Sequence, residues 1–275
     1  MFSQREGHSY RPVFPTPSEG EVAVTWIGHA TFLIQIGGFN ILTDPNWALW
    51  HGPVKRLREP GVAIRHLPPI DLILVSHAHF DHLHLGSLQR LDEGQTIIVP
   101  EGVGDLVKGM DYQVLELGNW ECFKRDGLRI TLTPARHWGA RMIHDTWRKF
   151  GGFLIEAGGR TVFHAGDSAM FDGFVEIGKR ADIDLAILPI GAYDSPSGRP
   201  VHMNPEESLD AFEMLGAKRL VPMHHATFPL GTEPVWEPEA RLTLEASLRK
   251  KRNMVDLLCE GSPRLYTPED MEIGI

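Results

Sequence analysis

The chain has 275 residues, of which 42% are hydrophobic, enough for one large domain or two small ones. Its 27 basic and 36 acidic residues give a net charge of −9, which argues against broad, sequence-independent binding of nucleic acid. Two distant cysteines, Cys122 and Cys259, predict small core residues in a reducing compartment rather than a disulfide framework. Residues 1–20 lack the apolar region of a signal peptide, and no apolar run reaches the roughly 18 residues of a membrane span, so we expect a cytoplasmic protein.

Short strands joined by tight turns dominate the predicted elements. Residues 1–20 are rich in Pro, Ser and Gly and predict an extended arm, whereas residues 21–275 predict a single domain. In the first half, strands are expected at 22–26, 32–36, 39–43, 71–75 and 96–99. In the second half, strands are expected at 121–125, 128–132, 153–156, 161–163, 185–188 and 220–222. Gly37-Gly38, Asp126-Gly127 and Gly158-Gly159 mark hairpin turns between neighbouring strands.

Helices are predicted between these strands. Asn204 and Pro205 are typical of a helix start, and Gly216 is typical of its end. Residues 237–251 predict a second amphipathic helix with Leu242, Leu244 and Leu248 on its apolar side, and shorter helices are expected after positions 86 and 101. Strands interspersed with helices favour sheets that are covered by helices on their outer faces.

Two segments of the sequence resemble each other. FLIQIGGFNILTD at 32–44 and FLIEAGGRTVFHAGD at 153–167 each contain a strand, a Gly-Gly turn, a second strand and then an aspartate. One interpretation is that any two Gly-Gly hairpins look alike. The other is that two similar β-halves pack face to face and bring Asp44 and Asp167 to a shared rim.

A dense group of metal-binding side chains follows the apolar run at 71–75. The segment SHAHFDHL at 76–83 places His77, His79, Asp81 and His82 within six positions. Imidazole nitrogens together with carboxylate oxygens suit Zn²⁺, Fe or Mn better than Mg²⁺ or Ca²⁺. One loop cannot fill two coordination spheres, so further ligands must come from other segments. Three candidates each follow a predicted strand, namely His137, Asp167 and His224.

The His-x-His-x-Asp-His pattern resembles the signature of the metallo-β-lactamase superfamily. Further segments resemble its N-acyl-phosphatidylethanolamine phospholipase D branch, with ascorbate-6-phosphate lactonases as more distant relatives: VTWIGHATFLIQIGGFNILTDP, TPARHWGAR, VFHAGDS, HMNPEES and PMHHATF. The resemblance runs from Val22 to Phe228. It implies an α/β fold, a four-layer αββα sandwich of two β-sheets flanked by helices, with a dinuclear metal site at one edge.

The resemblance also implies the metal ligands. Seven side chains match the family pattern: His77, His79 and His137 for the first ion, Asp81, His82 and His224 for the second, and Asp167 as the bridge between them. His224 rather than His225 matches the ligand position, and His225 stands where relatives often carry an aromatic residue. Two divalent ions are implied, with Zn²⁺ favoured and Mn²⁺ or Fe as alternatives.

The expected chemistry is hydrolysis. Two ions roughly 3.5–4 Å apart can share a water and lower its pKa toward about 7, which supplies a hydroxide that attacks phosphorus or carbonyl carbon. Asp167 would keep the ions together, Asp81 would also orient the nucleophile, and His202 would meet the substrate or leaving group unless it is a surface loop histidine. Asp44 would support ligand imidazoles by hydrogen bonding, unless it only forms a turn before Pro45.

The remaining histidines carry weaker expectations. His29 belongs to a cleft-side loop in the family, and His84 is expected to stabilise the ligand loop. The others are expected to be structural or exposed: His8, His51, His66, His144 and His164.

Tryptophans and arginines near the predicted ligands bear on the substrate. Trp47, Trp50, Trp138 and Trp147 either line an apolar pocket or belong to the core. Arg136, Arg141, Arg148 and Arg199 either contact a phosphate or are solvated surface charges. Together they favour a substrate with a phosphate and an apolar part, such as an N-acylated phospholipid.

The sequence therefore predicts a metal-dependent hydrolase, phospholipase D-like, that acts on a phosphodiester. A lactonase that opens a sugar-phosphate or other lactone is the first alternative, β-lactam hydrolysis is a weaker one, and a non-catalytic metal-bound sensor represents another class. We expect a small-molecule or lipid substrate with a phosphate or ester group and no nucleic-acid partner. No basic amphipathic helix or lipidation motif predicts a stable membrane anchor, and assembly into a homo-oligomer is left open.

Overall fold

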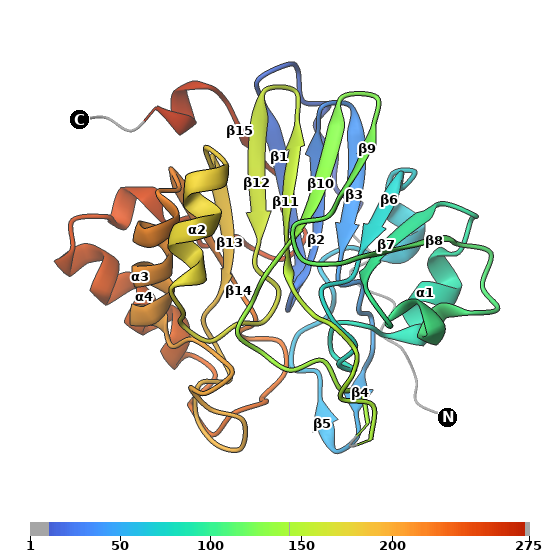
Figure 1. The fold of residues 1–275 in the computed structure, drawn as a ribbon. Helices are drawn as coiled ribbons and strands as arrows, with labels where there is room; N and C mark the ends of the chain where they lie inside the picture. Colours follow the sequence, from blue (N-terminus) through green and yellow to red (C-terminus); the bar gives the residue numbers. More distant parts are fainter. Residues whose placement is uncertain (1–10, 143, 273–275) are drawn as a thin grey trace.

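The computed structural model describes residues 11–142 and 144–272. Two β-sheets face each other and helices cover their outer sides (Figure 1). The predicted αββα sandwich is therefore confirmed. His8 and the first ten residues of the predicted arm lie outside the described residues, and residues 11–18 of the arm contain neither helix nor strand. Among the described residues, no helix is long and apolar enough to cross a membrane.

The first sheet has seven strands in the order β15-β1-β2-β3-β6-β7-β8. Their bounds are β1 Val22–Gly28, β2 Thr31–Ile36, β3 Phe39–Thr43, β6 Leu72–Leu74, β7 Thr96–Pro100, β8 Gln113–Leu117 and β15 Arg264–Tyr266. Strands β1, β2 and β3 form an antiparallel meander, and β3, β6, β7 and β8 run parallel. The sequence did not predict β8, which is largely exposed at the sheet edge, or β15, which has three residues.

The second sheet has six strands in the order β14-β13-β12-β11-β10-β9. Their bounds are β9 Cys122–Arg125, β10 Leu128–Thr133, β11 Gly152–Ala157, β12 Arg160–His164, β13 Leu185–Pro189 and β14 Arg219–Met223. Apolar side chains of both sheets, with Phe32, Ile34, Phe153 and Ile155 among them, form the core between the layers. A short separate hairpin, β4 Trp50–His51 and β5 Val54–Lys55, projects from the lower edge in Figure 1.

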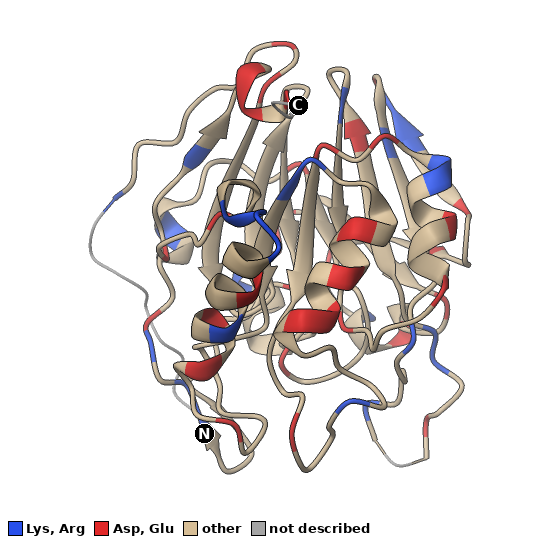
Figure 2. Cartoon of the chain, turned by 90° about the vertical axis from the view of Figure 1, so that its left-hand side faces the viewer, with Lys and Arg blue, Asp and Glu red and all other residues tan. Residues whose placement is uncertain are grey.

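Helices form the outer layers. Helix α1 (Leu85–Leu91) packs on the first sheet, while α2 (Gly173–Arg180), α3 (Pro205–Leu215) and α4 (Glu237–Leu248) cover the second. Short 3₁₀ turns span Ile64–His66, Gly104–Val107, Arg252–Met254 and Glu269–Met271. Acidic side chains recur along α3 and α4 (Figure 2).

The helix predictions hold at α3 and fail in part elsewhere. Asn204 and Glu207 form a reciprocal capping box at the start of α3, and Gly216 ends it with a φ of 63°. On α4, Leu242 is buried, but Leu244 and Leu248 are exposed, so the predicted apolar side was wrong at those two positions. The sequence also missed α2, whose Gly178 is a poor helix former but leaves room for the backbone of α3.

The prediction that Cys122 and Cys259 are core residues was wrong. Cys122 is only half-buried, in the edge strand β9, and Cys259 is exposed in the C-terminal segment, so neither is a core residue.

The two Gly-Gly turns meet at the upper edge of the sandwich. Gly37 and Gly38 join β2 to β3, and Gly158 and Gly159 join β11 to β12, each as a two-residue loop with positive φ at both positions. A Cβ atom added to Gly37 would lie 2.6 Å from the Cβ of Ala157 and 3.0 Å from the backbone nitrogen of Gly158. The two similar β-halves are therefore packed face to face with their turns in contact.

We expect Gly37→Ala to lower the free energy of unfolding by about 2–4 kcal/mol, for two reasons. Alanine would have to adopt the left-handed backbone conformation of Gly37, and its Cβ atom would clash with the neighbouring turn. Gly38→Ala is the matched control, since Gly38 also has a positive φ but has no neighbour within 4 Å of an added Cβ. Its loss should be about 1–2 kcal/mol. Chemical denaturation of both variants measures the difference, and equal losses would contradict the proposed packing of the turns.

Candidate metal centre

The predicted metal ligands follow strands that end at one edge of the sandwich. Strands β3 and β6 run parallel in the first sheet, while β12, β13 and β14 run parallel in the second. Strand β10 has the same direction as β12, because both are antiparallel to β11. The loops after these strands lie at the lower edge in Figure 1 and bring the distant ligand segments together.

One oxygen atom lies between two groups of histidines. Oδ2 of Asp167 is 3.1 Å from Nε2 of both His82 and His224. The same oxygen is 3.8 Å from Nε2 of both His77 and His137. The carboxylate of the second β-half thus faces both predicted metal subsites, as the bridging position requires.

The predicted ligands, together with His29 and His202, form three overlapping groups that could each hold a metal ion. The ligand atoms within each group lie within 4.8 Å of one another: His77, His79, His137 and Asp167 in the first, His29, Asp81, His82 and His224 in the second, and Asp167, His202 and His224 in the third. His225 belongs to none of these groups. Its ring stacks on Trp26 at 4.8 Å, and its Nδ1 lies 3.2 Å from Glu239. The structure thus brings all seven predicted ligands together and separates His225 from them.

Hydrogen bonds hold the outer nitrogen atoms of two ligand rings, His137 and His82. Nδ1 of His137 is 2.9 Å from the carbonyl oxygen of Val201, and Nδ1 of His82 is 2.7 Å from Oδ2 of Asp44. Carbonyl and carboxylate oxygens only accept, so each Nδ1 carries a proton and each Nε2 faces the cluster. Burial lowers the pKa of His137 to about 3, whereas at His82 burial is outweighed by the surrounding carboxylates, which raise its pKa well above the usual value. Metal binding requires an unprotonated Nε2 in both rings.

Several buried atoms of the cluster lack partners among the described residues. They include Nε2 of His82 and His224 and Oδ1 of Asp167. Buried polar atoms are seldom left without a partner in folded proteins. Divalent cations would satisfy the nitrogens and carboxylates at once, and the mixed donor set suits Zn²⁺, Mn²⁺ or Fe. The residues present therefore fit a bound metal.

The two aspartates of the cluster are ionised and surrounded by histidines. Burial raises the carboxyl pKa values of Asp81 and Asp167, but the surrounding histidines outweigh this effect and hold both values well below the usual range. Burial opposes a charge on His224, yet Asp167 and Asp81 raise its pKa to about 9. By contrast, burial lowers the pKa of His137 to about 3. Two ionised carboxylates thus lie in a buried site, where positive charge stabilises them.

Asp44 supports ligands through a network that the sequence predicted in part. Oδ2 of Asp44 accepts a hydrogen bond from the Ser76 hydroxyl at 2.7 Å, besides facing His82, and Oδ1 accepts from the Ser76 N–H at 2.7 Å. Because the Ser76 proton points to Asp44, Nδ1 of His77, 2.9 Å away, must donate to the Ser76 oxygen. Asp44 therefore orients His82 directly and His77 through Ser76, a residue that sequence reasoning missed.

Two further residues support Asp81. Nε2 of His29 is 2.9 Å from Oδ2 of Asp81, and Nδ2 of Asn46 donates to the Asp81 carbonyl oxygen at 2.5 Å. From the sequence, His29 was expected only to lie in a cleft-side loop, and no role was expected for Asn46. Both lie in the segment VTWIGHATFLIQIGGFNILTDP or just after it, which was the available signal.

His202 lies beside the metal cluster, and His84 lies at the start of helix α1. His202 is buried beside the cluster, with Nδ1 3.9 Å from Oδ2 of Asp167, and burial lowers its pKa to about 4. It is therefore not a surface histidine. His84 caps helix α1, where its side chain accepts a hydrogen bond from the Ser87 N–H at 3.1 Å. It thus stabilises the end of the ligand loop, as expected.

The four tryptophans near the predicted ligands lie in different environments. Trp47 is fully buried and donates to the Val62 carbonyl oxygen, so it is a core residue. Trp50 is half-buried below Lys55, and Trp147 lies against the guanidinium of Arg148. Trp138 alone of the four is in ring contact with a predicted ligand, His79, at 4.5 Å.

The four arginines have partners within the protein. Arg141 donates to the carbonyl oxygens of Ala78 and Leu83, both at 2.8 Å, and so holds the ligand loop in shape. Arg148 pairs with Asp145, Arg199 with Glu207, and the exposed Arg136 contacts the Met170 carbonyl oxygen. These contacts favour structural roles over the predicted phosphate binding.

The comparisons with known proteins agree with this geometry. A family model described as a beta-lactamase superfamily domain matches residues 39–225. The chain is 34% identical to N-acyl-phosphatidylethanolamine-hydrolyzing phospholipase D 1 of Caenorhabditis elegans, covering 82% of this chain and 70% of that protein. It is 36% identical to a UPF0173 metal-dependent hydrolase of Exiguobacterium, covering 75% of this chain and 87% of that protein. Among solved structures, the metallo hydrolase Igni18 of Ignicoccus hospitalis is 26% identical, with a TM-score of 0.69 over 90% of this chain and 98% of that one.

The fold and the cluster of histidines and aspartates define a metal-dependent hydrolase. The chain belongs to the metallo-β-lactamase superfamily, as its sequence motifs predicted.

Proposed function

We propose that the protein hydrolyses a phosphodiester bond of N-acylated phospholipids, in the manner of a phospholipase D, with two divalent metal ions. The observation that supports this most strongly is the position of Asp167 Oδ2 between two histidine groups. The likeness to the phospholipase D of Caenorhabditis elegans supports the choice of substrate. Zn²⁺ is the favoured ion, with Mn²⁺ or Fe as alternatives.

Each part of the cluster has a proposed task. His77, His79 and His137 would hold one ion, Asp81, His82 and His224 the other, and Asp167 both. When bound, the ions would polarise a phosphate oxygen and make a water more acidic. Asp81 would orient that water, while His202, whose Nδ1 has no hydrogen-bond partner among the described residues, would contact the leaving group. Hydrolysis would join the water oxygen to phosphorus, break the bond to the head-group alcohol and transfer a proton to that alcohol.

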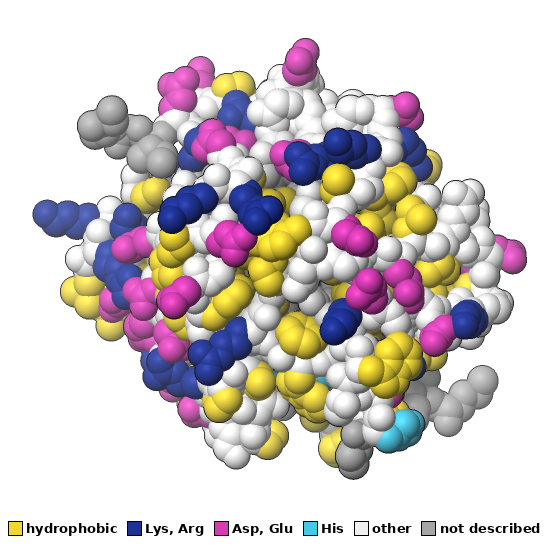
Figure 3. Space-filling model, in the orientation of Figure 1, with side chains coloured by type: hydrophobic (Ala, Val, Ile, Leu, Met, Phe, Trp, Pro, Cys, Tyr) yellow, Lys and Arg dark blue, Asp and Glu magenta, His cyan; other side chains and the backbone are white. Residues whose placement is uncertain are grey.

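Apolar side chains around the site support a lipid substrate. Phe80, Trp138 and Met142 are each about half exposed on the loops that carry or adjoin the ligands, and we call them the apolar rim. Apolar side chains also reach the surface along the lower edge of the molecule (Figure 3). Such a rim would contact acyl chains better than it would a small polar lactone.

A substrate panel tests the proposal. Metal-loaded protein should release N-acylethanolamine and phosphatidate from N-palmitoyl-phosphatidylethanolamine, as measured by mass spectrometry, and should also cleave bis(p-nitrophenyl) phosphate. Met142→Ala should raise KM for the lipid and leave the small diester unchanged, because only the lipid reaches the rim and Met142, unlike Trp138, has no ring in contact with a predicted ligand. Turnover of lactones without phosphodiester cleavage would instead identify a lactonase. Bound metal without any turnover would identify a sensor.

The proposed partners follow from this substrate. We propose a lipid or small ester as the ligand, no nucleic-acid partner and no stable membrane anchor. A gel assay with RNA and a vesicle sedimentation assay test the last two points.

A further inference from the structure

His29 lies in the turn between β1 and β2 and ties the two halves of the molecule together. Its backbone is left-handed, with a φ of 58°. Its N–H donates to Oγ1 of Thr227 at 2.8 Å, and its carbonyl oxygen accepts from the N–H of His224 at 3.2 Å and from Nε1 of Trp26 at 2.9 Å. A turn of the first half is thus fastened to the loop of the second half that carries His224.

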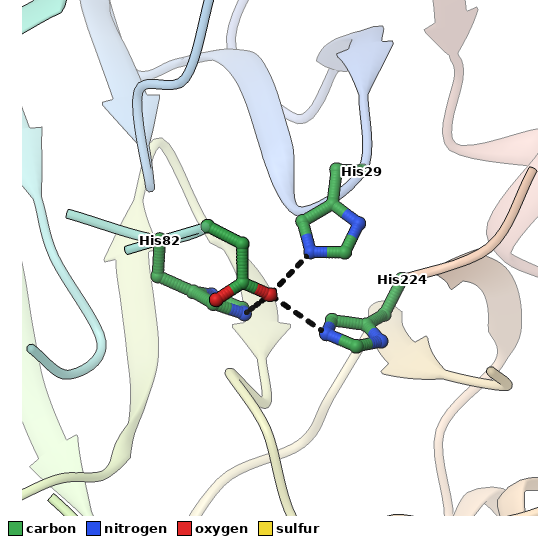
Figure 4. A group of neighbouring side chains, drawn as sticks. His29, His82 and His224 are labelled. Atoms are coloured by element: carbon green, nitrogen blue, oxygen red, sulfur yellow. Dashed lines mark hydrogen bonds and ion pairs between the residues drawn. The ribbon is translucent and has the colours of Figure 1, made fainter. Parts of the chain in front are cut away.

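The His29 side chain reaches the opposite ligand segment. Figure 4 shows His29, His82 and His224 converging on one carboxylate, which belongs to Asp81. Oδ2 of Asp81 is 2.9 Å from Nε2 of His29, 3.5 Å from Nε2 of His82 and 3.4 Å from Nε2 of His224. The shortest of these three distances is the one from His29.

The contact from His29 has the length of a hydrogen bond. The distance of 2.9 Å between Nε2 of His29 and Oδ2 of Asp81 is typical of an N–H···O hydrogen bond, whereas His224 and His82 lie 3.4 and 3.5 Å from the same oxygen. A carboxylate only accepts, so Nε2 of His29 donates to Asp81.

We infer that His29 is a positioning residue of the metal centre. Its side chain fixes the Asp81 oxygen and its backbone fixes His224, so one residue sets the spacing of two ligands from opposite halves. The inference rests on the proposed metal-binding role of Asp81, His82 and His224, but it does not depend on the substrate.

Metal content tests the inference without an activity assay. After loading with Zn²⁺ and dialysis, we expect His29→Ala to hold one ion fewer per chain than the wild type, or to bind that ion at least about 10-fold more weakly in chelator competition. His29→Gln can donate an amide N–H to Asp81 and should restore most of the affinity. Alanine and glutamine meet the same backbone penalty at this φ, so their difference isolates the side-chain hydrogen bond.

His225→Ala is the matched control. His225 is as buried as its neighbour His224, but its ring points to Trp26 and Glu239, so this variant should keep the wild-type metal count and affinity. Three results would each overturn the inference: wild-type metal binding by His29→Ala, no recovery in His29→Gln, or the same loss in His225→Ala. Protein that binds metal normally and fails to cleave phosphodiesters would contradict the proposed function alone.

Discussion

Asp167→Ala is expected to abolish hydrolysis and to release bound metal. We expect kcat/KM to fall at least about 10³-fold, or about 4 kcal/mol of transition-state stabilisation. The physical reason is that Oδ2 of Asp167 lies 3.1–3.8 Å from four imidazole nitrogens and supplies the negative charge shared by both subsites. Without Asp167, the positive charge of two cations held mainly by neutral imidazoles would no longer be balanced by a shared carboxylate. Kinetics with bis(p-nitrophenyl) phosphate and elemental analysis of the purified variant measure both effects.

Asp184→Asn is the control for Asp167→Ala. Asp184 is also a buried carboxylate of the second sheet, but it pairs with Arg160 and Lys218 before strand β13, at the end opposite the metal cluster. This variant should lose stability while it keeps its metal and its kcat/KM. If the Asp167→Ala variant kept both ions and more than about a tenth of the wild-type activity, the bridging role of Asp167 would be refuted.

Asp44→Ala is expected to have the second-largest effect, on stability and on metal affinity together. Removing this fully buried carboxylate leaves His82 and Ser76 without their shared partner. Loss of one partner from a buried ionic network costs about 3–5 kcal/mol, and loss of a group that orients ligands costs about 10–100-fold in metal affinity. Denaturant unfolding of the metal-free protein and chelator competition measure the two effects separately.

Ser76→Ala separates the two branches of this network. It removes the link from Asp44 to His77 and leaves the 2.7 Å contact between Asp44 and His82 in place. We therefore expect a smaller loss of affinity than in Asp44→Ala. A wild-type metal affinity in Asp44→Ala would show that the network does not orient the ligands.

Much of the fold and of the cluster could be predicted because the signals are local. The Gly-Gly pairs at 37–38 and 158–159 specify tight turns, and the β-branched runs beside them specify strands. Four ligand-type residues within 77–82 have few explanations other than a metal, and each remaining ligand follows a recognisable strand. Strand direction then brings their loops to one edge.

Apart from Asp44 and His84, the residues that support the ligands could not be predicted, because their roles depend on distant contacts. His29 acts on a carboxylate 52 positions away, and Ser76 links Asp44 to His77 through a hydroxyl proton whose direction depends on the folded network. Sequence position was also an unreliable guide to where a side chain points. Trp47 follows Asp44 by three positions, but its side chain points into the core, while the exposed Leu244 and Leu248 of α4 had the spacing of buried residues.

Anomalous X-ray scattering from crystals of metal-loaded protein tests the central claim most directly. We expect two peaks per chain at the absorption edge of the bound metal, one beside His77, His79 and His137 and one beside Asp81, His82 and His224, with Asp167 contacting both. A map without peaks at this edge of the sandwich, or with ions held by other side chains, would contradict it.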